Sequence, residues 1–208
     1  MTDDRRLVIA IDGPSGAGKG TLARSVASAL GYRHVRPPGF EPWNHAFVPA
    51  DRRLAQLRSR FGSRVSGTAV PRPRVVRASI DRADLLEVAR HLKEALGFDQ
   101  LSCVSAVEWP DRFESVYHLM NYYNGVTVQL HARIPKDDPK VASVCALWNA
   151  ANYHEREAWD LMGVVYEGHP NLERILLPAD FKFHPLRKDF PQEVDRQYIS
   201  RRKLKGGK

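Results

Sequence analysis

The sequence has no apolar run long enough to cross a membrane. Its longest runs, such as residues 7–11, contain five residues, whereas a transmembrane helix needs roughly 20. A secretory signal would need a basic start and a longer apolar segment, but this chain opens with Asp3 and Asp4 and continues into a glycine-rich loop. We therefore expect a cytosolic protein.

Cysteine is also scarce, which limits the metal chemistry of the chain. The only two, Cys103 and Cys145, lie 42 positions apart and form no Cys-x-x-Cys pair, so the chain cannot build a zinc or iron–sulfur site from cysteines. We expect both to be buried free thiols. His154 and Glu157 lie one helical turn apart, but they could supply only half of a metal site. We therefore predict no metal.

Positive charge is abundant but unevenly placed. The chain has 32 Lys and Arg against 24 Asp and Glu, which on its own favours an anionic partner such as nucleic acid or lipid. However, residues 36–77 hold 9 basic and 2 acidic side chains, residues 78–195 hold 12 and 19, and residues 196–208 hold 6 and none. The expected core is acidic, so we predict no nucleic-acid partner. The basic tail could touch RNA or lipid, although we expect it to be solvated or bound to an acidic neighbour.

The patterns divide the chain into four parts and predict an α+β fold. Residues 1–35 read as an isolated β-α unit, residues 36–50 as a Pro- and Arg-rich linker, residues 51–195 as the main domain and residues 196–208 as a basic tail. Proline and arginine remain frequent up to residue 77, so we expect that stretch to be partly linker as well, with one short helix at 52–61. For the main domain we expect an antiparallel sheet with helices on one side and an extended C-terminal segment.

Several element boundaries can be predicted within the main domain. Apolar spacing predicts a helix over residues 82–96, with Ser79 or Asp81 as its cap and Gly97 as its stop. Alternation predicts strands at 101–107, 113–121 and 127–134, and Asn124-Gly125 predicts a hairpin turn between the last two. Helical spacing resumes over residues 141–162, and the chain from Gly163 onward is expected to be irregular.

The sharpest motif is the glycine-rich stretch at residues 13–21, between an apolar strand and a helical pattern. Glycines let backbone N–H groups turn toward a phosphate, the helix N-terminus adds partial positive charge, and the lysine reaches the outer phosphates. The residue after that lysine is Gly20, so a magnesium-binding hydroxyl would come from the next position. The candidate nucleotide-binding residues are Gly13, Gly16, Gly18, Lys19 and Thr21.

Residues 9–21, with Gly31 and Tyr32, resemble the start of a cytidylate kinase. The resemblance implies ATP-dependent phosphorylation of a nucleoside monophosphate. Such an enzyme also needs further parallel strands, a monophosphate-binding region and an arginine-bearing lid, and none of these patterns follows residue 35. We therefore expect residues 1–50 to lie outside the working fold, and we keep the kinase as the alternative function.

A second set of residues, toward the C-terminus, has the character of a docking surface. On the predicted helix, Arg156 and Asp160 are four residues apart and are expected to pair, while Trp159 and Met162 share an apolar side. The alternation of proline and charge that follows suits an extended segment laid across another protein. The candidate docking residues are Glu155, Arg156, Glu157, Trp159, Asp160, Gly168, His169, Pro170, His184, Pro185, Arg187, Lys188 and Asp189.

These strings, together with 91–98, 111–119 and 134–139, resemble the C subunit of proton-translocating NADH-quinone oxidoreductase, the 30-kilodalton subunit family of complex I, over about residues 51–195. The resemblance implies a scaffold protein of the peripheral arm that binds no cofactor itself. NADH, FMN, iron–sulfur clusters and quinone would belong to the assembly. The implied partners are the quinone-site D subunit and the iron–sulfur subunits, at the cytoplasmic side of the bacterial inner membrane, with membrane contact only through the complex.

Overall fold

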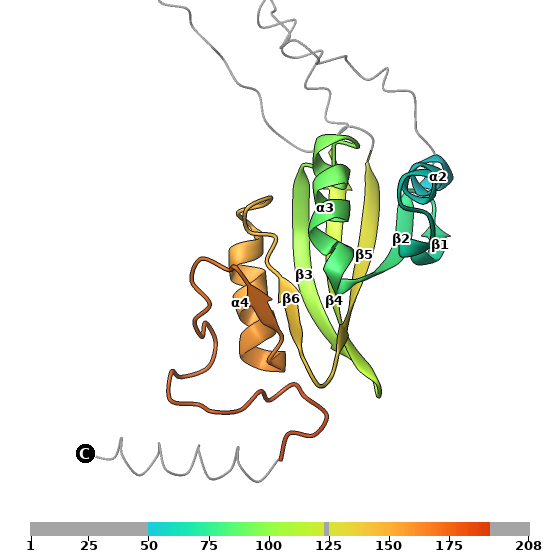
Figure 1. The fold of residues 1–208 in the computed structure, drawn as a ribbon. Helices are drawn as coiled ribbons and strands as arrows, with labels where there is room; N and C mark the ends of the chain where they lie inside the picture. Colours follow the sequence, from blue (N-terminus) through green and yellow to red (C-terminus); the bar gives the residue numbers. More distant parts are fainter. Residues whose placement is uncertain (1–49, 123–124, 192–208) are drawn as a thin grey trace, which may run out of the picture. The chain divides into compact units, whose positions relative to one another are not determined.

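The computed structural model describes residues 50–122 and 125–191, all within the unit Val48–Lys208 (Figure 1). The candidate nucleotide-binding residues lie outside this described part. The elements are, in chain order, α2 (Ala50–Phe61), η1 (Gly62–Arg64), β1 (Ser66–Arg72), β2 (Val75–Asp81), η2 (Arg82–Asp84), α3 (Leu85–Glu94), β3 (Gln100–Glu108), β4 (Arg112–Asn121), β5 (Val126–Pro135), β6 (Lys140–Ala142), α4 (Ala151–Met162) and β7 (Val165–Glu167).

The main sheet is mixed, which corrects the expected antiparallel sheet. Its strand order is β1-β2-β5-β4-β3, and the pair β2–β5 is parallel while the other pairs are antiparallel. The crossover through α3 explains the parallel pair. It carries the chain from β2 to the far edge of the sheet, so that β3 runs in the direction of β2, and two reversals then give β5 that direction again. The short strands β6 and β7 form a second, parallel pair.

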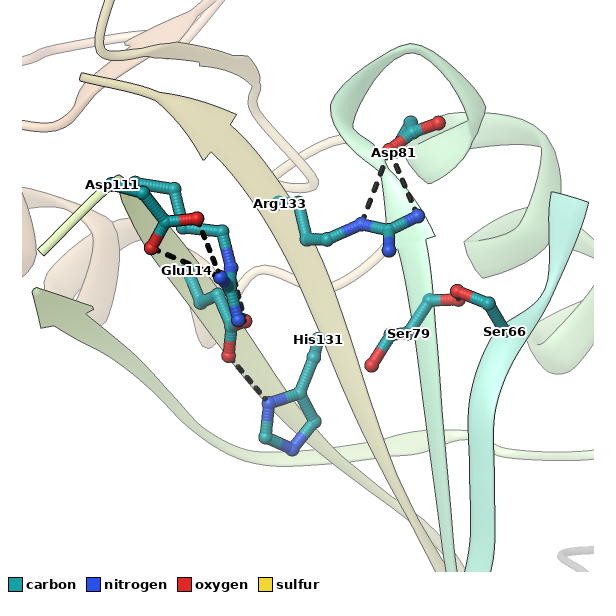
Figure 2. A network of polar contacts seen from close by, with 8 residues as sticks. Ser66, Ser79, Asp81, Asp111, Glu114, His131 and Arg133 are labelled. Carbon is teal, nitrogen blue, oxygen red and sulfur yellow. Dashed lines mark hydrogen bonds and ion pairs between the residues drawn. The ribbon is translucent and has the colours of Figure 1, made fainter. Parts of the chain in front are cut away.

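The helices and the inward side chains of the strands share one core. α2 contributes Leu57 and α3 contributes Leu92, and both are fully buried with the alternating strand residues Ile80, Leu130 and Leu119. This is the amphipathic pattern that the sequence predicts for a helix-covered sheet. The opposite face of the sheet carries polar side chains, several of which are drawn in Figure 2, and no helix of the described part covers it.

Most predicted elements of the main domain are confirmed with small boundary changes. The three predicted strands are β3, β4 and β5, and the predicted helix at 82–96 is η2 followed by α3. Gly97 adopts a φ of 70°, as a helix stop requires. Asp81 occupies the N-cap position of η2, but its side chain makes no capping hydrogen bond, and its carboxylate pairs with Arg133 at 3.0 Å instead (Figure 2). Ser79 lies within β2.

Two other expectations are corrected by the described residues. Of the stretch at residues 36–77, read as partly linker, residues 50–77 are not linker but form α2 and the β1–β2 hairpin, and Pro71 is accommodated because β1 is the edge strand of the described sheet. The helical spacing that begins at Val141 belongs in part to β6, where Val141 pairs with Tyr166 of β7. A pairing with a residue so distant in sequence overrides local helical spacing. Among the described residues, no helix is long and apolar enough to span a membrane.

Candidate docking surface around helix α4

The charged candidate docking residues of α4 lie on both the inner and the outer sides of the helix. Glu155 and Asp160 are fully buried, Arg156 is half-buried and Glu157 is exposed. Two buried carboxylates on one helix each require their own hydrogen-bond donors, because an unpaired buried charge is costly. The structure supplies a separate set of donors for each.

Glu155 binds the loop between β6 and α4. Its carboxyl oxygens accept hydrogen bonds from the Ser143 hydroxyl at 2.6 Å and the Val144 backbone N–H at 2.8 Å, and the Cys145 thiol lies 3.4 Å away. Burial raises the pKa of Glu155 above its ordinary value, against the opposing effect of these donors. The side chain therefore fixes the loop that leads into the helix.

The same carboxyl belongs to a cluster that sequence reasoning did not find. The potential ligand atoms of Cys145, Glu155 and His169 lie within 4.8 Å of one another, and zinc accepts such donors. His169, however, uses both ring nitrogens: Nε2 lies 3.1 Å from the Asn152 carbonyl, and Nδ1 accepts from the Asn171 N–H at 3.0 Å. Burial also raises the pKa of Cys145 to about 11. These interactions favour a hydrogen-bonded cluster over a metal site.

A cavity of about 340 Å³ lies next to this cluster. Its lining carries no charged side chain, and the predicted docking residues Gly168 and Pro170 form one wall. Gly168 adopts a φ of 79°, where a side chain would be strained although nothing lies within 4 Å of its added Cβ. The cavity is lined by Cys145, Ala146, Asn149, Asn152, Gly168 and Pro170.

Asp160 binds the C-terminal segment, which we define as residues 168–191. One carboxylate oxygen accepts three backbone N–H groups, from Ile175 at 3.1 Å and from Leu176 and Leu177 at 2.9 Å each. The other oxygen pairs with Arg174 at 2.5 Å. Burial alone would raise the pKa of Asp160, but these donors together outweigh it and lower the pKa below its ordinary value.

The expected ion pair between Arg156 and Asp160 was wrong. Arg156 instead donates to the backbone carbonyls of Glu173 at 3.0 Å and Arg174 at 3.2 Å. Asp160 is fully buried, and Arg174 reaches its carboxylate at 2.5 Å. Both Arg156 and Asp160 nevertheless hold the same turn of the C-terminal segment against α4.

The end of α4 is packed by a second part of the C-terminal segment. Arg187 donates to the Met162 carbonyl at 2.8 Å, and its guanidinium lies 5.2 Å from the Phe113 ring centroid. His184 lies 3.0 Å from the Asp160 carbonyl, and burial lowers its pKa. Gly163 has a φ of 73°, and a Cβ there would lie 2.6 Å from His184 and 2.7 Å from Arg187. Glycine is thus required by conformation and by packing.

The remaining predicted residues differ in what they contact. Trp159 is half-buried, with the Arg174 guanidinium 5.6 Å from its ring centroid. The backbone N–H of Lys188 donates to Glu108 at 2.8 Å, and Glu108 also pairs with Lys136 at 2.7 Å. Asp189 is exposed and Pro185 is half-buried. The C-terminal segment is therefore fixed at both ends.

Sequence reasoning missed the partners that complete these contacts. Arg174 lies in one of the recognised strings, but nothing in the sequence pairs it with Asp160. Ser143 and Glu108 belong to no motif, and all three meet their partners through the fold, 12 to 80 positions apart in sequence. Only the position of Arg174 between the two stretches of candidate docking residues could have drawn attention to it. The C-terminal segment, expected to need a foreign surface, in fact packs one side on α4.

Its other side exposes apolar side chains. Leu176 is 61% exposed and Leu186 is 60% exposed, although the Leu176 N–H is bonded to Asp160 and the Leu186 N–H to the Leu161 carbonyl. Phe183, at 43%, is also exposed, in contact with the rings of Phe181 and Phe190. A fixed backbone that presents apolar side chains outward is typical of a protein-binding surface.

Comparison with known protein families identifies the family of this chain. The family model described as Respiratory-chain NADH dehydrogenase, 30 Kd subunit, matches residues 78–196. The chain belongs to this family. The cytidylate kinase model matches residues 9–38, which agrees with the resemblance of the N-terminal motif.

Individual relatives agree with this family. The chain is 36% identical over 152 residues to the C subunit of F(420)H(2) dehydrogenase from Methanosarcina mazei, covering 70% of this chain and 96% of the relative. It is 48% identical over 113 residues to the C subunit of NADH-quinone oxidoreductase from Moorella thermoacetica, covering 53% and 76%. Among solved structures, a chain of the archaeal membrane-bound sulfane sulfur reductase is 27% identical with a TM-score of 0.63, covering 72% and 91%.

Proposed function

We propose that this chain is a docking scaffold in the peripheral arm of a proton-translocating NADH-quinone oxidoreductase and performs no chemistry by itself. The observation that carries the proposal is the C-terminal segment, whose backbone is pinned to buried Asp160 while Leu176 and Leu186 remain exposed. Because such a surface is ordered before binding, association loses less conformational entropy. The chain would thereby support electron transfer from NADH to quinone.

The proposed partners follow from the family. They are the quinone-site D subunit and the iron–sulfur subunits, and the assembly would hold NADH, FMN, clusters and quinone. The chain would lie at the cytoplasmic side of the bacterial inner membrane and contact the membrane only through the complex. Family membership and the exposed apolar side chains support this placement.

The test is to replace one exposed leucine by a charge in the tagged full-length chain. Leu176→Glu places a charge on the docking surface, and Leu86→Glu makes the same change on α3, where Leu86 is 37% exposed. The complex is purified from host membranes in mild detergent and its subunits are quantified by mass spectrometry. We expect recovery of partner subunits to fall about tenfold for Leu176→Glu and to stay unchanged for Leu86→Glu.

Thermal unfolding of each purified chain separates docking from folding. Because Leu176 is exposed, its replacement should leave the melting temperature within a few degrees of the parent. Normal recovery of the complex with Leu176→Glu and Leu186→Glu would contradict the proposal.

The second candidate function is an ATP-dependent cytidylate kinase, favoured by the match over residues 9–38. Its candidate nucleotide-binding residues are Gly13, Gly16, Gly18, Lys19 and Thr21. If the purified full-length chain binds ATP and phosphorylates CMP, and Lys19→Ala abolishes both, the kinase is established. The docking proposal expects no turnover by the isolated chain.

A further inference from the structure

The face of the main sheet turned away from the helices is a continuous surface built by four strands. We call it the helix-free face. Its residues follow from the strand registers, which align Arg77 with Gln129, Gln129 with His118, and His118 with Cys103. By the same registers, the face comprises Val75, Arg77, Ser79, Asp81, Cys103, Ser105, Val107, Glu114, Val116, His118, Met120, Thr127, Gln129, His131 and Arg133.

One end of this face neutralises its own charges. Asp81 pairs with Arg133 at 3.0 Å, and Arg112 pairs with Glu114 at 2.8 Å and with Asp111 at 2.9 Å (Figure 2). Each of these carboxylates therefore has a guanidinium partner from the same chain. Because these charges are already paired, this end of the face gains little from a further charged ligand.

The other end carries arginines that have no such partner. Arg77 is exposed on β2, and Arg72 is exposed on β1 opposite Val75. Neither makes an ion pair with a carboxylate of the described chain. On the helix side the situation differs, because Arg64 pairs with Asp84 at 2.9 Å and with Glu87 at 2.7 Å.

The excess of arginine over acidic residues extends through the segment that contains Arg72 and Arg77. Residues 50–77 contain eight arginines and one aspartate. Of these arginines, Arg77 and Arg72 lie on the helix-free side, and a partner that approaches them would meet a positive potential before contact.

His131 supplies a second, independent observation near the centre of the face. Its Nδ1 lies 3.1 Å from Glu114 (Figure 2), whereas its Nε2 is buried and has no hydrogen-bond partner in the described part of the chain. A buried ring nitrogen without a partner is uncommon and costs free energy. Because atoms of this chain already cover Nε2, a partner that docks on the face would reach it only if neighbouring side chains rearrange.

We propose that the helix-free face is a second docking surface, which receives an acidic segment of another subunit whose carboxylates pair with Arg77 and Arg72. The inference rests on the proposed docking function and adds a surface distinct from the C-terminal segment. The exposed apolar side chains of Val107 on the face and of Trp109 just beyond the end of β3 suit a protein partner. A nucleic acid presents a long row of phosphates, and the described residues of this face offer it few unpaired cations, so a short acidic segment fits better.

The first experiment reverses one charge in the tagged full-length chain, expressed in its host in place of the native copy. Arg77→Glu is compared with Arg90→Glu, which makes the same change at an exposed arginine of α3 on the helix side, and with Arg77→Lys. Partner subunits recovered from membranes in mild detergent are measured by mass spectrometry. We expect recovery to fall about tenfold for Arg77→Glu, to remain near normal for Arg77→Lys, and to be unchanged for Arg90→Glu.

The second experiment identifies what covers the face. A photo-cross-linking p-benzoylphenylalanine replaces Gln129, which is half-buried beside Arg77, and in a control it replaces Arg90. We expect a cross-link from position 129 to a peptide rich in Asp and Glu from a copurifying subunit. A cross-link to a second copy of this chain, to residues 1–49, to lipid or to nucleic acid would overturn the proposal, as would assembled complex without any cross-link at position 129.

The two proposals fail in different ways. If Leu176→Glu abolishes recovery while Arg77→Glu leaves it normal, the docking function stands and the second surface is wrong. If both variants recover the complex normally, both proposals are wrong. Thermal unfolding of the Arg77→Glu chain shows whether a loss of recovery comes from docking, since an exposed arginine contributes little to folding.

Discussion

The two buried carboxylates of α4 occupy regions of opposite character. Asp160 is surrounded by donors: three backbone N–H groups and the Arg174 guanidinium. Glu155 faces one backbone N–H, a thiol and a hydroxyl, and the hydroxyl can either donate or accept. The first region is built for a negative charge, and the second accommodates a neutral group equally well.

This difference appears in the direction of each pKa shift. The donors lower the pKa of Asp160, so its contribution to stability is present above its ordinary value of 3.8 and is lost as the pH falls through the native pKa. Burial raises the pKa of Glu155, so its contribution is present below its ordinary value of 4.5 and is lost as the pH rises through the native pKa. The contributions of these two fully buried carboxyls to stability therefore depend on pH in opposite directions.

The largest effect is expected when the charge at Asp160 is removed without changing its shape. Asp160→Asn would direct an amide NH₂ at groups that are themselves donors and would leave Arg174 without its carboxylate. We expect a loss of about 3–5 kcal/mol in the free energy of unfolding. Urea unfolding followed by circular dichroism measures it, and a loss below about 1 kcal/mol, the worth of an ordinary hydrogen bond, would show that Asp160 does not anchor the C-terminal segment.

A smaller loss is expected when the Glu155 side chain is truncated. Glu155→Ala leaves the buried Val144 N–H without its acceptor and opens a small cavity, which together cost about 2–3 kcal/mol. Hydrogen exchange at Val144, followed by NMR, should speed up, while exchange at Leu176 and Leu177 stays near the parent value. Faster exchange at both places would mean that the two regions are not independent.

A weaker effect is expected at Arg156, which donates to two carbonyls from a half-buried position. Arg156→Ala should cost about 1 kcal/mol, because water can partly replace the donor that these carbonyls lose. Arg174→Ala, measured in the same urea experiment, should cost several times more, since it strands a buried carboxylate. Equal losses for the two arginines would contradict the distinction between them.

The sequence predicted the elements around these residues better than their partners. Periodicity predicts the strands β3, β4 and β5 and the helix α3, because each depends on side chains nearby in the chain. The pairing of β2 with β5 and of β6 with β7 depends on residues far apart, and no local pattern specifies it. Reasoning from composition also fails at the hairpin of β1, where an edge position tolerates Pro71.

The candidate site shows the same limit. Residues 155–160 could be recognised as a unit from the sequence, yet the i, i+4 rule assigned the wrong cation to Asp160. That rule treats a helix as a surface exposed to solvent, and Asp160 is fully buried. Which side of the helix faces inward is decided by the sheet and by the C-terminal segment, so Arg174 could be identified as the partner only once the fold was known.

The smallest effect is expected when Glu155 loses its charge but keeps its shape. Glu155→Gln keeps the shape and can accept from Val144 while its amide donates to the Ser143 hydroxyl, so we expect a change below about 1 kcal/mol at neutral pH. Only the parent titrates at this position, and its native pKa lies above the unfolded one. Between the unfolded pKa of 4.5 and the higher native pKa, the native state binds more protons, so the parent loses stability relative to Glu155→Gln as the pH rises through this range. Urea midpoints of both proteins across this range measure the difference, and parallel curves would show that the pKa of Glu155 is the same in the folded and unfolded chains.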